Sequence, residues 1–348
     1  MKTLTIVNDC HAGAQRASGT TPLTAWQLRQ YLNEDLRRLV NEIDTDLCIL
    51  GDLFDTGTVP MADILSVWET LRAWLAKGLS LYLVRGNHDD SKNTTVLSSF
   101  QFLCRLLTAE FPGQVTEISS PTALAEHGAY VVPHVANQDI YDEALASVPA
   151  CQYLLVHANF NNGFAVESDH SLNMSLEQAA ACKAKYIIFA HEHQAKSALN
   201  GKVFVCGNQT PSSVSDCLGN DIKSLTLLQG GAPERLQTWS RLGNYAEQDW
   251  RSLTDSGEKF IRVVGEATAA EAADVVSAIA KFRNRAKALV ITNAVKVEGA
   301  ADGEQIQVSL EQVKTFDVLG ALLECLDERE QAVVNDLLKK REAGDRGE

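Results

Sequence analysis

The stretch LVRGNHDDSKN, residues 83–93, joins an apolar run to a cluster of polar side chains. Short apolar runs of this kind, bounded by turn residues, are typical of buried strands. The Gly, Asn and Asp residues that follow suit a tight turn. Open α/β folds, however, also place their binding residues at the carboxyl ends of strands. The stretch by itself leaves both interpretations open, so the ends of the other predicted strands must decide between them.

Several further runs have the length and β-branched character of strands. Together with Leu79–Val84 before the quoted turn, they are Leu4–Val7, Leu47–Leu50, Ala129–Val132, Tyr153–Val156, Tyr186–Phe189 and Val203–Val205. Residues 24–43 and 62–78 repeat apolar side chains at three- and four-residue steps, which predicts helices between the early strands. Strands that alternate with helices predict a layered α/β domain.

Five of these strands end in Asp, Asn or His. The endings are Asp9-Cys10-His11, Asp52 to Asp55, Asn87-His88, His157 and His191-Glu192-His193. Any one of them alone is better explained as a turn or as a core histidine. Because strand side chains repeat every second residue, Asp-x-His and His-x-His are expected to present two ligands on one side. Oxygen and imidazole ligands without thiolate suit Mn²⁺, Fe²⁺, Zn²⁺ or Mg²⁺, and seven ligands fit two ions.

The order D-x-H, G-D-x-x-D, G-N-H-D, a strand-end His and H-x-H, across residues 9–193, resembles the signature of the calcineurin-like metallophosphoesterases. The resemblance implies a four-layer α/β/β/α sandwich that binds two divalent ions, with Mn²⁺ expected and Mg²⁺, Fe²⁺ or Zn²⁺ as alternatives. The implied ligands are Asp9, His11, Asp52 and His193 for one ion, and Asp52, Asn87, His157 and His191 for the other. Ala190 stands where the family usually has Gly, a difference that removes no ligand.

Two residues of the same motifs have implied catalytic roles. His88 corresponds to the non-ligand histidine of the family, and it is expected to stabilise charge or to protonate the leaving oxygen. Asp55 is expected to orient His88 through a ring N–H, with a plain turn carboxylate as the alternative. Asp89 and Asp90 are expected to cap the turn and the following helix, and Cys10 is expected to be a buried bystander.

The pattern of apolar and polar residues in the 348-residue chain changes near Trp250. We therefore predict a metallophosphoesterase domain over residues 1–250, a small α+β capping domain over 256–300 and a C-terminal helical pair over 305–348. The last two segments resemble the capping domain and the ATPase-binding tail of SbcD-like DNA repair nucleases, and the compact length resembles phage-encoded members. This resemblance implies a 3′–5′ exonuclease for DNA, with endonuclease activity left open, and an SbcC-like coiled-coil ATPase as partner.

A nuclease also needs cations near the phosphates, although a formal net charge of −14 argues against a general nucleic-acid coat. The candidate DNA contacts are Arg16, in a Gly/Ser/Thr loop, and Lys281, Arg283, Arg285 and Lys287, in the densest basic run. A flexible loop and a solvated helix end are the alternatives. The competing function is a phosphatase or phosphodiesterase of small molecules or phosphoproteins, because the fold alone does not choose the substrate.

The composition is that of an ordinary globular protein, 45% hydrophobic and 22% charged. No apolar run is long enough to cross a membrane, and the polar residues from Asn8 onward argue against a signal peptide. The eight cysteines form no CxxC pair, which indicates reduced thiols. We expect a cytoplasmic protein, in the host cytoplasm if it is phage-encoded. Homodimerisation is common in nucleases of this type, and residues 23–32 are the candidate interface.

Overall fold

The computed structural model describes residues 1–14, 22–91, 96–162 and 171–298. Arg16 and the predicted helical pair 305–348 therefore lie outside the described residues. The segment Met1–Val297 forms one compact unit. Within the described ranges no helix combines the length and the apolar character that crossing a membrane requires. The seven cysteines in those ranges are free thiols.

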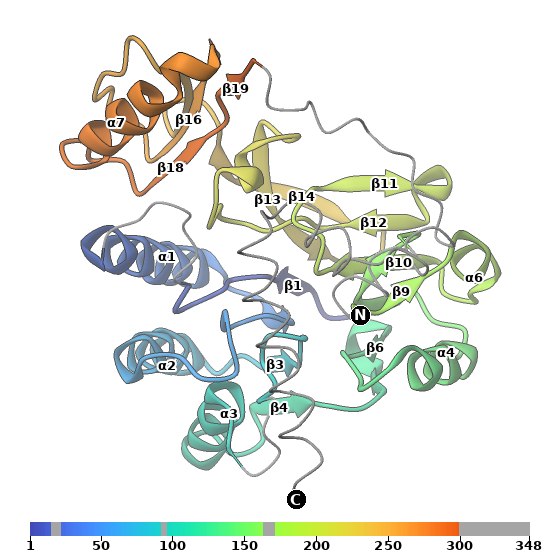
Figure 1. Cartoon of the computed structure of the whole chain (residues 1–348). Coiled ribbons are helices and arrows are strands. Elements are labelled where there is room, and N and C mark those ends of the chain that lie inside the picture. The colour runs from blue at the N-terminus through green and yellow to red at the C-terminus, as the bar shows by residue number, and fades with distance from the viewer. Residues whose placement is uncertain (15–21, 92–95, 163–170, 299–348) are drawn as a thin grey trace, which may run out of the picture. The chain divides into compact units, whose positions relative to one another are not determined.

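The first sheet has six strands in the order β14-β13-β1-β2-β3-β4. Its parallel strands are β1 (Leu4–Val7), β2 (Asp46–Leu50), β3 (Leu81–Val84) and β4 (Val115–Ile118). β13 (Ile222–Leu228) runs antiparallel to β1, and β14 (Glu234–Ser240) runs antiparallel to β13. Helices α1 (Pro22–Glu42), α2 (Met61–Leu75) and α3 (Ser99–Glu110) cover its outer face (Figure 1). The strands β1, β2 and β3 are buried between the layers and largely apolar, as is typical of strands that are covered on both faces.

The second sheet has the order β11-β12-β10-β7-β6-β5. Its parallel strands are β6 (Ala129–Val132), β7 (Tyr153–His157), β10 (Tyr186–Ala190) and β12 (Val203–Val205). The antiparallel edge strands are β5 (Thr122–Leu124) and β11 (Lys196–Ala198). Helices α4 (Gln138–Ala146) and α6 (Leu176–Ala181) lie on its outer face, beside the short pair β8 (Asn159–Phe160) and β9 (Asn173–Met174).

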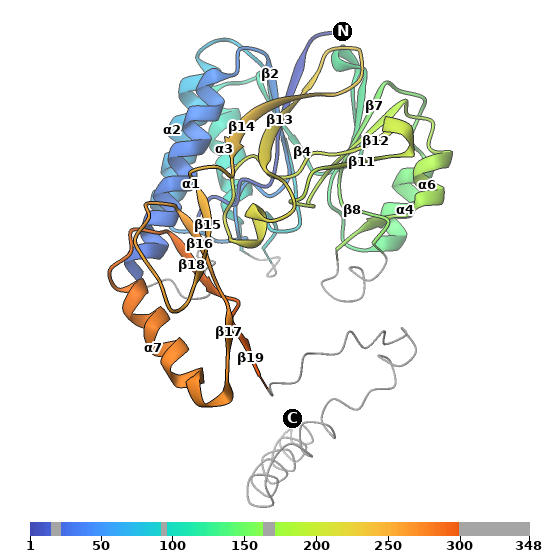
Figure 2. The same cartoon turned by 90° about the horizontal axis from the view of Figure 1, so that it is seen from above.

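The two sheets pack face to face between the two helical layers, as Figure 2 shows. A continuous apolar layer joins Leu4, Leu50 and Val84 of the first sheet to Tyr153 and Ile188 of the second. This architecture confirms the predicted four-layer α/β/β/α sandwich. Because the inner strands of each sheet are parallel, their carboxyl ends meet at one edge, where α/β folds place their chemistry.

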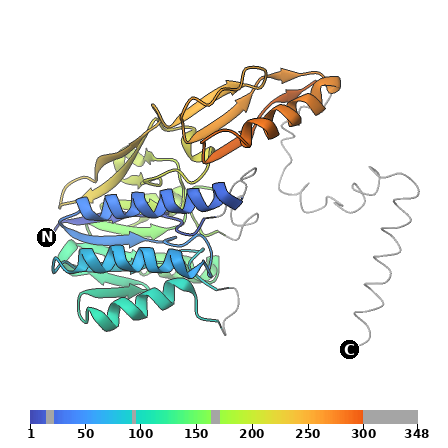
Figure 3. The same ribbon diagram turned by 90° about the vertical axis from the view of Figure 1, so that its left-hand side faces the viewer.

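A smaller sheet follows, with β16 (Phe260–Val264) between β15 (Tyr245–Asp249) and β18 (Val290–Asn293), all parallel. Helix α7 (Ala272–Arg283) runs along it, as Figure 3 shows, and the two-stranded pair β17 (Glu266–Ala267) and β19 (Lys296–Val297) extends it. Val275, Ile279 and Phe282 of α7 pack on Ile261 to form its core. This unit contains the small α+β segment predicted over residues 256–300, and β15 is added to it from residues before 250. Phe260 also shares a core with Leu28 of α1.

Candidate metal centre

The predicted ligands follow the carboxyl ends of β1, β2, β3, β7 and β10. Backbone hydrogen bonds fix these strand ends together, since the amide of Asp9 donates to Gly51 (3.1 Å) and that of His11 donates to Asp52 (3.0 Å). Gly51 has a φ of +80°, and a Cβ there would lie 2.1 Å from Nδ1 of His157. Glycine is therefore required at this position, because a side chain would both strain the backbone and displace a ligand.

The ligand pairs do not lie on extended segments. Asp9, His11 and His191 have φ values of 49°, 46° and 81°, which place them in the left-handed region. The expectation that strand alternation aligns the two residues of each pair was wrong, because β1 ends at Val7 and β10 ends at Ala190. Turns after the strands bring the side chains together instead. Such backbone strain is characteristic of functional sites.

The first group of side chains that could hold a metal ion comprises Asp9, His11 and His193. The Nε2 atoms of His11 and His193 lie 3.1 Å apart. Oδ2 of Asp9 accepts a hydrogen bond from the amide of His191 (3.0 Å). Oδ1 of the same carboxylate is buried and has no hydrogen-bond partner among the described residues. A buried carboxylate oxygen without a partner is costly, so the position of this atom fits a ligand of a cation.

The second group comprises Asp52, His157 and His191, and Asn87 lies among them. Oδ1 of Asn87 is 3.0 Å from Nε2 of His157 and 3.0 Å from Nδ1 of His191. Oδ2 of Asp52 is 3.3 Å from Nε2 of His157. The structure therefore gathers every predicted ligand into two adjacent groups, within which atoms from separate strand ends converge.

The hydrogen bonds of the rings determine which nitrogen atoms face a metal ion. Nδ1 of His157 faces the carbonyl of Leu50 (3.0 Å), and Nδ1 of His193 faces the carboxylate of Asp216 (2.7 Å). Nδ1 of His11 lies 3.3 Å from Oδ1 of Asp55, an ion-pair distance without a hydrogen bond. Carbonyl and carboxylate oxygens accept, so the Nδ1 atoms of His157 and His193 carry the proton.

It follows that Nε2 of a neutral His193 presents a lone pair toward Nε2 of His11 across 3.1 Å. Nε2 of a neutral His157 likewise presents a lone pair toward the acceptor Oδ1 of Asn87 across 3.0 Å. Such pairs repel unless a cation or a shared proton lies between them. The donor set thus fits two divalent cations, and His191 would bind through Nδ1, unlike the other three rings.

The pKa shifts of His157 and Asp52 in the second group also favour a bound cation. Burial lowers the pKa of His157, but the adjacent Asp52 carboxylate outweighs burial and raises that pKa to about 9. Burial raises the pKa of Asp52, yet His157 and then His11 and His88 hold it well below its usual range. The group therefore stabilises positive charge, and a metal ion would replace the protons that the rings otherwise hold.

His88 and Asp55 meet beside the two groups. Nδ1 of His88 donates to the backbone carbonyl of Asp55 (2.6 Å), and Nε2 of His88 is 4.0 Å from Oδ2 of Asp52. The orienting contact thus comes from the backbone of Asp55, while its carboxylate contacts His11. The side chain of His88 is 32% exposed and reaches solvent. As expected for a turn cap, Asp89 accepts from the amides of Gly86 (2.9 Å) and Phe54 (3.1 Å).

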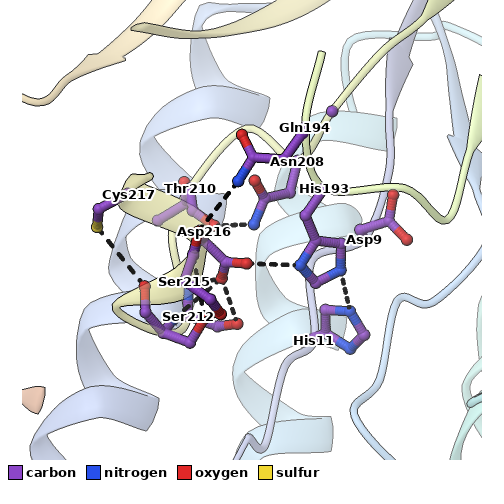
Figure 4. A network of polar contacts seen from close by, with 12 residues as sticks. Asp9, His11, His193, Gln194, Asn208, Thr210, Ser212, Ser215, Asp216 and Cys217 are labelled. Carbon is purple, nitrogen blue, oxygen red and sulfur yellow. Dashed lines mark hydrogen bonds and ion pairs between the residues drawn. The ribbon is translucent and has the colours of Figure 1, made fainter. Parts of the chain in front are cut away.

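Asp216 was not predicted from the sequence; it lies in the short helix η3 (Ser215–Cys217) and contacts His193 (Figure 4). Asn8 and Gln209 were not predicted either, and their side chains form a buried pair beside Asp9, in which the Gln209 amide donates to Oδ1 of Asn8 (2.9 Å). The only sequence signal that could have pointed to Asp216 was the Ser-rich composition of residues 212–216. Nothing in that composition indicates a partner 23 residues earlier in the chain.

The predicted basic run, residues 281–287, includes the end of α7 and the residues that follow it. The guanidinium of Arg283 donates to the carbonyl of Ile291 (3.0 Å), and that of Arg285 donates to the carbonyl of Leu253 (2.8 Å). Both arginines therefore brace the small sheet unit. Lys281, Arg285 and Lys287 are exposed.

The family model described as calcineurin-like phosphoesterase matches residues 2–195. No curated protein matches the chain. Among solved structures, TT1561 of Thermus thermophilus is similar at 13% identity and a TM-score of 0.41, covering 68% of this chain and 99% of that one.

Two further solved structures are similar over 68% of this chain. One is a novel archaeal phosphodiesterase, at 10% identity and a TM-score of 0.34, with 99% of its own chain covered. The other is a cold-active protein-tyrosine phosphatase of a psychrophilic Shewanella species, at 12% identity and a TM-score of 0.34, with 81% covered. The family model spans more than half of the chain and includes every predicted ligand, and the chain therefore belongs to the calcineurin-like phosphoesterase family.

Proposed function

We propose that this chain is a 3′–5′ DNA exonuclease that hydrolyses phosphodiesters with two divalent cations. Membership of the phosphoesterase family supports metal-dependent phosphoester hydrolysis. The observation that carries the two-cation proposal is the pair of opposed nitrogen atoms, Nε2 of His11 and Nε2 of His193, beside the orphaned Oδ1 of Asp9. The mixed oxygen and imidazole donor set supports Mn²⁺ over Mg²⁺.

Each proposed ligand has one assigned atom. Oδ1 of Asp9, Nε2 of His11 and Nε2 of His193 would hold the first cation, and Oδ1 of Asn87, Nε2 of His157 and Nδ1 of His191 would hold the second, with Asp52 between them. When bound, such cations lower the pKa of water and neutralise phosphoryl charge. The amide of Asn87 adds no negative charge, which leaves the centre positive enough to attract a phosphodiester.

The chain itself supplies the proton. The bond from Nδ1 of His88 to the carbonyl of Asp55 fixes the ring, so we assign Nε2–H of the doubly protonated imidazolium as the donor to the leaving oxygen, which leaves the ring neutral after the transfer. Its partial exposure lets the ring meet a substrate that approaches from solvent.

The proposal that DNA is the substrate rests on the segments that follow the four-layer sandwich. The small sheet unit with the exposed Lys281 and Lys287 supports a DNA contact, in line with the resemblance to SbcD-like nucleases. The same resemblance supports a coiled-coil ATPase as the partner of residues 305–348, where apolar stripes recur at helical spacing. A homodimer and a cytoplasmic location belong to the same proposal.

The experiment compares three substrates in the presence of Mn²⁺. Bis-p-nitrophenyl phosphate should be hydrolysed faster than the p-nitrophenyl monoester, since the proposed centre serves a diester. DNA labelled at its 5′ end should then yield a ladder of shortening fragments, while DNA labelled at its 3′ end should release the label at once. A preference for the monoester, with intact DNA, would support the competing phosphatase function instead.

A further inference from the structure

The imidazole of His193 has different surroundings on its two sides. Figure 4 shows Nε2 facing His11 while Nδ1 meets the carboxylate of Asp216. The distance from Nδ1 to Oδ1 of Asp216 is 2.7 Å, short for a nitrogen–oxygen pair and typical of a charge-assisted hydrogen bond. Asp216 is buried, with 3% of its surface exposed.

Hydrogen-bond donors surround both oxygens of Asp216, and Oδ1 faces Nδ1 of His193. Oδ2 accepts from the amide and the hydroxyl of Ser212 (2.8 and 3.0 Å) and from the amide of Ser213 (3.0 Å). A carboxylate with this many donors is rigid, and it holds the ring of His193 in one orientation.

The backbone of His193 is fixed from the same segment of the chain. Lys223 is buried, and its ammonium donates to the carbonyl of His193 (2.8 Å). The residues that fix both the ring and the carbonyl therefore come from residues 212–223, beyond the span 2–195 that the family model matches. The matched span contains the ligands, but this later segment sets the orientation of one of them.

In the second group, Nδ1 of His157 meets a neutral group instead, the carbonyl of Leu50 at 3.0 Å. An ionised partner makes an imidazole a stronger donor to a metal than a neutral carbonyl does, because it stabilises the positive charge that the ring acquires. We therefore expect the imidazole of His193 to be a stronger metal ligand than the imidazole of His157.

From this difference we infer that Asp216 is a positioning residue for the first cation, which sets the affinity of the group Asp9, His11 and His193. The inference rests on the proposed two-cation centre. Outer carboxylate partners of metal-bound histidines typically change metal affinity by about 10–100-fold. Asp216→Asn should therefore weaken one of two Mn²⁺ sites by about that factor and leave the other unchanged.

The test is calorimetric titration of chelator-treated, full-length protein with Mn²⁺. The Asn87→Ala background removes a ligand of the second group, so that the first site is followed alone, and Asp216→Asn should weaken it about 10–100-fold. In the His193→Ala background the same substitution should have no further effect, because Asp216 acts through that ring. A role limited to folding would lower the affinity in both backgrounds.

Asp221→Asn is the matched control, since this carboxylate lies in the same segment, is 87% exposed and faces Arg241 at 3.5 Å. It should leave both sites unchanged. Equal weakening of both sites by Asp216→Asn, or no change, would overturn the inference. If that variant does not fold, Ser212→Ala decides, because removing one donor to Asp216 should weaken the first site alone; unchanged binding would overturn the inference. Wild-type protein that binds no Mn²⁺ would instead contradict the proposed function.

Discussion

Replacing His88 by alanine should lower DNA turnover by about 10²–10⁴-fold while both cations remain bound. This corresponds to about 3–5 kcal/mol of transition-state stabilisation. The cost in folding stability should be much smaller. The ring is 32% exposed and makes a 2.6 Å hydrogen bond to the carbonyl of Asp55, and a bond of that kind is worth about 1 kcal/mol. Loss of fold therefore cannot account for the expected loss of rate.

The assay compares leaving groups. A nitrophenolate leaves without a proton, whereas the sugar oxygen of DNA needs one, so a general acid matters far more for DNA. The His88→Ala variant should therefore lose most of its activity on DNA and much less on bis-p-nitrophenyl phosphate. Equal losses would assign His88 to charge stabilisation instead. Loss of Mn²⁺ in calorimetric titration, or undiminished DNA turnover, would refute the reasoning.

Three further predictions concern the centre and the DNA contact. Asp52→Ala should remove both cations and all turnover, measured by metal content after dialysis, because Asp52 lies between the two groups. Gly51→Ala should cost several kcal/mol and weaken Mn²⁺ binding, since its Cβ would lie 2.1 Å from Nδ1 of His157. Replacing Lys281 and Lys287 together by Glu should weaken DNA binding and reduce its salt dependence by about one unit of slope per lost contact.

Each of these predictions has its own control. EDTA-treated wild-type protein should regain activity with added Mn²⁺, and full activity without any metal would contradict the Asp52 prediction. An unchanged melting temperature in Gly51→Ala would show that His157 can move aside. Arg283→Ala and Arg285→Ala should lower the melting temperature, because their guanidinium groups brace carbonyls. If the lysine variant also loses activity on a small diester, those lysines do not act through DNA.

The inner strands could be predicted from the sequence because they are covered on both faces. Val203–Val205 and Ala129–Val132, for example, are unbroken apolar runs, and the structure gives them the predicted bounds. The edge strand β4 lacks this signal, since Val115 and Ile118 at its ends are buried and the two residues between them are exposed. β13 pairs Leu228 with Leu4, a contact between distant parts of the chain that no local pattern encodes.

The candidate site could be predicted to a similar extent and for related reasons. Parallel strands bring their carboxyl ends to one edge, so polar residues at those ends predict a shared site without any detail of the turns. The turns themselves were not predictable, and the left-handed backbone of Asp9 and His11 replaced the expected strand alternation. Asp216 escaped prediction because a folded segment, not a sequence motif, delivers it to His193.

The central claim is that two cations occupy the adjacent groups, and anomalous diffraction from crystals grown with Mn²⁺ tests it most directly. We predict two anomalous peaks about 3.5–4 Å apart. One should contact Oδ1 of Asp9 and Nε2 of His11 and His193, and the other should contact Oδ1 of Asn87, Nε2 of His157 and Nδ1 of His191. A single peak, peaks elsewhere on the chain, or binding of His191 through Nε2 would contradict the account.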